Sequence, residues 1–139
     1  MNHSAKGLFD VQLAPERLSA VAEHTGLGRL SLDKTYHGDL TGTSQGEMLS
    51  FRGSTPGSAG YVAMETVRGT LHGLSGTFVL QHSSTMTRGI PAQSITVVPD
   101  SGTEALAGIT GNLVIMISNA QHAYEFTYAL PEGQTEAHA

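Results

Sequence analysis

Apolar and polar residues alternate with a period of two along most of the chain. Successive side chains of a β-strand point to opposite faces, so this period is typical of half-buried strands. Only Pro15–His24 carries helix-start signals, with Pro15 in a first-turn position and Glu16 after it, and it predicts one short helix or an ordered loop. The clearest alternating runs are Leu30–Leu32, Val62–Met64, Phe78–Leu80, Ile95–Val97, Leu113–Ile117 and Tyr124–Tyr128.

The pattern predicts about eight strands with short, glycine-containing connections. Glycine adopts positive φ without strain, so the recurring segments Leu40–Thr43, Leu74–Thr77 and Ile109–Asn112 are interpreted as tight turns. Further turns are expected at Pro99–Gly102 and Gly53–Gly60. The expected strands are Leu8–Leu13, Arg29–Tyr36, Gly42–Phe51, Tyr61–Leu71, Gly76–Met86, Ala92–Val98, Asn112–Ser118 and His122–Leu130.

The expected fold is all-β: a closed, antiparallel, up-and-down barrel of about eight strands. Short connections place neighbouring strands antiparallel, and closure removes the unpaired edges that would aggregate. The lumen of such a barrel holds either packed side chains or one small ligand. A two-sheet sandwich is the alternative. We expect a single domain over residues 7–131, with flexible ends at residues 1–6 and 132–139.

Composition and charge exclude several classes of function. The formal net charge is -5 and the Lys and Arg residues are scattered, so no basic face is expected for nucleic acid. The chain has no cysteine, which excludes disulfides, thiolate nucleophiles and Cys-ligated metals. Neither a signal peptide nor a membrane span is expected, and we predict a cytoplasmic protein. The sequence has no nucleophile elbow. It also has no phosphate-binding loop or other cofactor motif, so no cofactor is expected.

Four segments resemble a bacterial family of domains of unknown function, and the likeness extends from about Phe9 to Pro131. That family is similar to the allene oxide cyclase type of barrel, a calycin-like fold, which supports the barrel expectation. Cyclases of this type bind an apolar or reactive substrate in the lumen and steer its conformation. No catalytic set of such a cyclase is recognised here, so the chemistry is an analogy between folds only. The segments are Leu32–Leu40, Gly60–Glu65, Phe78–Ser83 and Val97–Thr103.

Ionisable residues in the middle of strands are the candidates for chemistry. His82 follows Phe78 and Leu80 at spacing two, so the three should share a face, and in the lumen this imidazole could act as acid, base or donor. The alternative for His82 is a structural role, in which the imidazole forms a hydrogen bond with a main-chain group. Glu65 shares a face with Tyr61 and is a candidate for a raised pKa and proton transfer.

Each of these candidates also has a structural interpretation. Glu65 could instead form a salt bridge with Lys34 or Arg68, or lie outward at an oligomer contact. Lys34 could pair inward with Glu47 or Glu65, bind a ligand carboxylate, or extend to water. Glu47 is a weaker ligand candidate, because a solvated outer face is favoured for it.

The predicted site therefore has Glu65 and His82 as catalytic residues, with Lys34, Glu47, Tyr61 and Tyr124 in contact with ligand. Tyr124 belongs to an aromatic stripe with Phe126 and Tyr128, a pattern that is more often core than ligand platform. The histidines are dispersed, so no metal site is expected.

Two functions remain open. The first is a binding barrel for an apolar or amphipathic small molecule, with or without cofactor-free cyclisation, isomerisation or proton transfer. The second is a non-catalytic barrel plugged by its own side chains, which forms a homodimer, a higher homo-oligomer or another protein contact. Outward Val62, Met64 and Val67 would favour the second.

Overall fold

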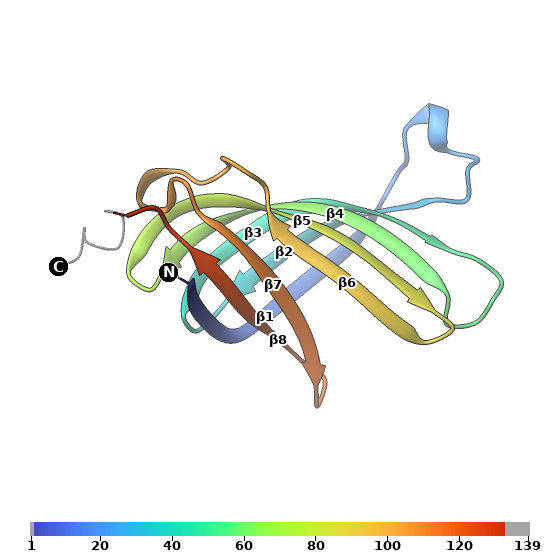
Figure 1. Cartoon of the computed structure of the whole chain (residues 1–139). Helices are drawn as coiled ribbons and strands as arrows, with labels where there is room; N and C mark the ends of the chain where they lie inside the picture. The colour runs from blue at the N-terminus through green and yellow to red at the C-terminus, as the bar shows by residue number, and fades with distance from the viewer. Residues whose placement is uncertain (1, 133–139) are drawn as a thin grey trace.

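The computed structural model describes residues 2–132 and is a closed barrel of eight antiparallel strands in sequence order (Figure 1). Each strand pairs with its neighbours along the chain, and β1 closes the ring against β8. The fold class predicted from the alternating pattern is therefore confirmed. The strands are β1 (Asn2–Glu16), β2 (Gly28–Tyr36), β3 (Leu40–Arg52), β4 (Ala59–Leu71), β5 (Leu74–Thr87), β6 (Ile90–Val97), β7 (Thr110–Ser118) and β8 (Gln121–Ala129).

Strand β1 is much longer than the sequence pattern indicated. Its first half, residues 2–9, pairs with β8, and its second half, residues 9–16, pairs with β2. The flexible end expected at residues 1–6 is thus wrong for residues 2–6, because main-chain pairing with β8 holds this polar segment and Ala5 is fully buried. The flexible end expected at residues 132–139 lies, except for Glu132, outside the described residues.

Apart from Ile109, the three recurring glycine segments lie inside strands rather than in turns. Gly38, Gly73 and Gly108, one or two residues before them, are the glycines with positive φ at these three connections. Within the strands, glycine is needed for close approach: a Cβ on Gly42 would lie 2.2 Å from the carbonyl oxygen of Arg68 on β4. The segments were misread because glycine serves both purposes, and only the strand register separates them.

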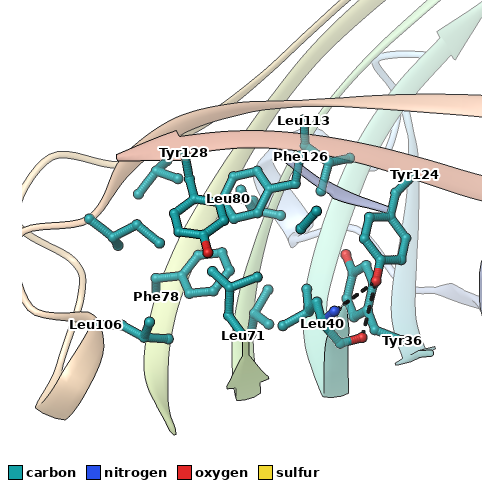
Figure 2. Close-up of a cluster of buried hydrophobic side chains, with 14 of the residues drawn as sticks. Tyr36, Leu40, Leu71, Phe78, Leu80, Leu106, Leu113, Tyr124, Phe126 and Tyr128 are labelled. Carbon is teal, nitrogen blue, oxygen red and sulfur yellow. Dashed lines mark hydrogen bonds between the residues drawn. The ribbon is translucent and has the colours of Figure 1, made fainter. Parts of the chain in front are cut away.

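One end of the barrel is filled by its own side chains. Apolar residues from β3, β4, β5, β7 and β8 meet there, and the connection between β6 and β7 closes the end with a 3₁₀ turn, Glu104–Leu106, whose Leu106 is fully buried. Figure 2 shows Phe78 and Phe126 in the middle of this plug, and their rings stack at 5.6 Å. Val67, expected on the outer face, is also fully buried here because it shares the inward parity of Glu65.

The barrel wall is weakest between β6 and β7. Only one residue pair, Thr96 with Asn112, is in register between these strands, although every other neighbouring pair has eight or more. Beyond it the strands diverge (Figure 1). The side chain of Gln93 bridges the gap by accepting a hydrogen bond from the Ile115 N–H at 2.7 Å. A side chain thus stands where a ladder hydrogen bond would otherwise be.

The connection between β1 and β2 extends from the opposite end of the barrel (Figure 1). It contains one 3₁₀ turn, Ala20–Ala22, so the segment expected as a short helix or ordered loop is mostly loop. In residues 2–132 no helix has the length and apolar character to cross a membrane.

A buried carboxylate network beneath an open cavity

Glu65 is the centre of a polar network in the middle of the barrel. Its side chain lies on the inward face of β4 and is 1% exposed. One carboxylate oxygen accepts hydrogen bonds from Lys34 Nζ at 2.8 Å and from His82 Nε2 at 2.5 Å. The other accepts from the hydroxyls of Tyr36 at 2.6 Å and Ser44 at 2.7 Å. Every partner is itself buried, so the carboxylate is fully satisfied without water.

Strand register and one glycine bring these side chains together. Gly46 on β3 lies directly beside Glu65, and because it has no side chain, Lys34 and Tyr36 on β2 can reach across β3 to the carboxylate. A Cβ on Gly46 would lie 1.9 Å from the carbonyl oxygen of Met64. The network therefore depends on a glycine at this position in β3.

The network keeps Glu65 ionised. Burial alone would raise the pKa of this carboxyl, but the hydrogen bond from His82 and the positive charge of Lys34 outweigh it and lower the pKa to about 2. The raised pKa expected from the sequence is therefore wrong, because the apolar surroundings of Glu65 include a cation and three further donors. Burial, together with the negative charge of Glu65, raises the pKa of the Tyr36 phenol well above 10.

An ionised Glu65 also fixes the tautomer of His82. A carboxylate only accepts hydrogen bonds, so His82 Nε2 must carry the proton that it shares with Glu65. The other ring nitrogen, Nδ1, has no hydrogen-bond partner in residues 2–132. In the neutral ring Nδ1 is then an acceptor with a free lone pair.

The half of the lumen above this network is an open cavity of about 870 Å³. Lys34, His82 and Ser84 contribute to its lining, and all three are at least nine-tenths buried. The hydroxyl oxygen of Ser84 is buried and has no hydrogen-bond partner. Most of the remaining lining is apolar and includes Phe9, Val11, Leu30, Leu32, Met48, Ala63 and Ile115.

The structure brings together four of the six residues predicted for the site. Glu65, His82 and Lys34 form the network, and Tyr61 lines the cavity, half-buried. Phe78, Leu80 and His82 share one face of β5, as the spacing predicted, and in the structure this face is the inward one.

Glu47 and Tyr124 lie elsewhere. Glu47 is on the outer face, paired with Arg29 at 2.5 Å, so it does not face Lys34 in the lumen. Tyr124 is in the plugged half, where its hydroxyl accepts from the Leu40 N–H at 2.9 Å and also lies 3.1 Å from the Leu40 carbonyl oxygen (Figure 2). The same hydroxyl donates to the His37 carbonyl at 2.8 Å. Main-chain groups therefore satisfy the Tyr124 hydroxyl. Tyr124 belongs to the core, as the aromatic stripe favoured.

Three polar members of the site were missed by the sequence reasoning. Ser84 is the next position after His82 on the inward face of β5, so continuing the alternation along this strand would have found it. Tyr36 follows Lys34 in the same way on β2. Ser44 carried no signal, because only the pairing of β2 with β3 places it beside Lys34. Within residues 2–132, no cluster of three or more His, Cys, Asp or Glu side chains could hold a metal ion.

Together, the fold and the site define a small, closed β-barrel that is plugged at one end and holds a ligand-sized cavity over a buried, ionised network. The chain belongs to the family described as "Protein of unknown function (DUF3224)", whose profile matches residues 5–128.

A solved structure from the same family has nearly the same fold. It is a crystal structure of a DUF3224 protein of unknown function from Shewanella oneidensis MR-1, 45% identical to this chain. The match covers 96% of this chain and 100% of that one, with a TM-score of 0.89. No curated protein matches the chain.

Proposed function

We propose that the barrel binds a small, largely apolar molecule in its lumen, with the polar end of that molecule on Lys34, His82 and Ser84. The observation that carries this proposal is the cavity of about 870 Å³, whose lining includes Lys34, His82 and Ser84, the last with a hydroxyl that has no hydrogen-bond partner. Pockets for small molecules usually have volumes of about 300–1,000 Å³, apolar walls and a few placed polar groups.

The apolar walls supply the affinity. Side chains such as Val11, Met48 and Ile115 line the cavity and are only half-buried. Covering them with an apolar ligand removes this surface from water, which is favourable by about 25 cal/mol per Å². A ligand with an apolar body is therefore the class that gains most from this lumen.

The polar surface supplies orientation. A buried hydroxyl without a partner, such as that of Ser84, costs about 1–3 kcal/mol, and a ligand oxygen could remove this cost. His82 Nδ1 can accept a hydrogen bond from a ligand N–H or O–H. Lys34, with one hydrogen bond to Glu65, keeps donor capacity for a ligand oxygen.

The resemblance to allene oxide cyclase-type, calycin-like barrels supports the same placement of the ligand, because those barrels bind apolar substrates in the lumen. The resemblance carries no catalytic residues to this chain. A cytoplasmic location and the lack of nucleic-acid or membrane partners remain predictions from composition and charge.

A thermal-shift screen with a matched pair of variants tests the proposal. The compounds are fatty acids, aromatic acids, phenols and apolar ketones, since a ligand bound only by the folded state raises Tm. Ser50→Phe places a ring in the cavity, whereas Ser4→Phe places the same ring on the outer face at the plugged end. We expect a rise in Tm that Ser50→Phe abolishes and Ser4→Phe keeps. A rise that survives Ser50→Phe, or no rise with any compound, contradicts lumen binding.

An outer face of the barrel supports a second candidate function, self-association. Leu49, Val62 and Met64 are 44%, 51% and 47% exposed, and Leu49 is the register partner of Val62 on the neighbouring strand. Contiguous exposed apolar residues are typical of protein contacts. If this face forms a homo-oligomer, light scattering at 100 µM will give a dimer or larger, and Val62→Lys will give a monomer. A monomeric wild-type protein rejects this function and leaves lumen binding intact.

A further inference from the structure

The free nitrogen of His82 gives the cavity a chemical capability beyond binding. Its Nε2 donates to an ionised carboxylate, so in the neutral form of the ring Nδ1 carries a lone pair without a partner in residues 2–132, and His82 is one of the residues that line the cavity. This is the arrangement of a general base whose orientation and tautomer are set by a neighbouring carboxylate.

We propose that His82 is a catalytic base that removes a proton from the carbon next to a carbonyl group of an apolar ketone bound in the lumen. This inference rests on the proposed function, because the ketone must occupy the cavity.

The step is a simple proton transfer. The C–H bond next to the carbonyl breaks, its electron pair stays on the substrate as an enolate, and the proton bonds to His82 Nδ1. The imidazolium that results keeps its Nε2–H on Glu65, whose negative charge stabilises it. Return of the same proton to the same carbon regenerates the ketone, and return of a deuteron that has replaced it from D₂O gives isotope exchange. Transfer to a different carbon of a conjugated substrate gives an isomer. No oxidant, reductant or metal is required.

Two further groups can stabilise the enolate oxygen. Ser84 lies two residues from His82 on the same inward face of β5, and its buried hydroxyl has no other partner. Lys34 supplies a positive charge, held by Glu65 at 2.8 Å and lying 4.9 Å from the centre of the Phe9 ring. Donors placed where negative charge develops give the largest single contribution in many enzymes.

Glu65 itself is a positioning residue rather than the base. Four buried donors surround its two oxygens, so neither oxygen is free to receive a substrate proton. Its role is to hold His82 and to balance the charge that His82 gains. Glu65→Gln would remove that charge, so we expect the pH profile of the reaction to move as well as the rate to fall.

Deuterium exchange into small ketones tests the inference directly. The probes are 2-tetralone, phenylacetone and 2-undecanone in D₂O near neutral pD, followed by ¹H NMR at the carbons next to the carbonyl. We expect the wild-type protein to raise the exchange rate of at least one probe tenfold or more over buffer. General acid–base catalysis contributes about 10²–10⁴-fold, so His82→Gln should return the rate close to that of buffer. We expect Ser84→Ala to lower it about tenfold.

His24 offers a matched control. It lies in the connection between β1 and β2, outside the cavity, and its side chain is 91% exposed, so His24→Gln should keep the exchange activity. Exchange that no probe shows, or that survives His82→Gln, overturns the inference. Thermal shifts with the same ketones separate binding from catalysis. If a ketone raises Tm but its protons do not exchange, His82 is not a catalytic base, and the proposal of binding in the lumen stands.

Discussion

Replacing Glu65 by glutamine should remove most of the acid sensitivity of this barrel. The folded-state pKa of Glu65 is about 2, against 4.5 for the free side chain. A group with a depressed pKa contributes stability that is fully present above its unfolded pKa and is lost as pH falls through its folded pKa. The window for Glu65 therefore runs from about pH 5 down to about pH 2. At 1.36 kcal/mol per pKa unit, the loss across it is about 3 kcal/mol.

Urea unfolding at several pH values between 2 and 7, followed by far-UV circular dichroism, measures this loss. At pH 7, Glu65→Gln should already be about 3–5 kcal/mol less stable, because it leaves Lys34 buried without its counter-charge. Its free energy of unfolding should then change by about 3 kcal/mol less than that of the wild-type protein between pH 5 and pH 2. Glu47→Gln is the control, because Glu47 is an exposed carboxylate paired with Arg29 on the outer face.

If the free energy of unfolding falls equally between pH 5 and pH 2 in the wild-type protein and in Glu65→Gln, the reasoning is refuted. It is also refuted if Glu47→Gln removes this decrease. If Glu65→Gln does not fold, Lys34→Met is the second test. Without the cation the pKa of Glu65 rises, so the acid loss should begin at a higher pH than in the wild-type protein.

Four further predictions follow from single contacts. Ser84→Ala should raise the Tm of the ligand-free protein by a few degrees, because it removes a buried hydroxyl without a partner; a lower Tm in calorimetry would contradict this. The raised pKa of Tyr36 means that stability is present below pH 10 and lost above it, and ultraviolet titration should show a late phenol that Tyr36→Phe abolishes. Gly46→Ala should destabilise the barrel by more than about 2 kcal/mol in urea unfolding, since its Cβ would lie 1.9 Å from a carbonyl oxygen of β4. Gln93→Leu should speed hydrogen exchange of the Ile115 amide about fivefold, while exchange in the β3–β4 ladder stays unchanged.

The fold could be predicted from the sequence because each strand has one buried and one exposed face. Period two is then visible without any structure, and short connections leave a meander as the simplest topology. What the pattern did not reveal was how far pairing extends. The first half of β1 is polar and small, and it is held by main-chain hydrogen bonds to β8 that leave no hydrophobic signal.

The alternation of inward and outward positions along the strands also indicated the centre of the site. Ionisable side chains at inward positions of buried strands are costly unless paired, so Lys34, Glu65 and His82 stood out in a chain poor in charge. Their mutual contacts could not be predicted, because these depend on the register of β2, β3 and β4. The direction of the Glu65 pKa was misjudged for the same reason: four donors, not the apolar neighbours in sequence, decide it.

The protonation of the His82 ring tests the account most directly. Long-range ¹H–¹⁵N correlation spectra, assigned with His82→Gln, report which ring nitrogen carries the proton. The structure predicts a proton on Nε2 and, in the neutral form of the ring, a bare Nδ1, with a change in the Nδ1 signal when 2-tetralone is added. A proton on Nδ1 with a bare Nε2, or an Nδ1 signal that no apolar ketone changes, would contradict a basic nitrogen directed at a ligand in the lumen.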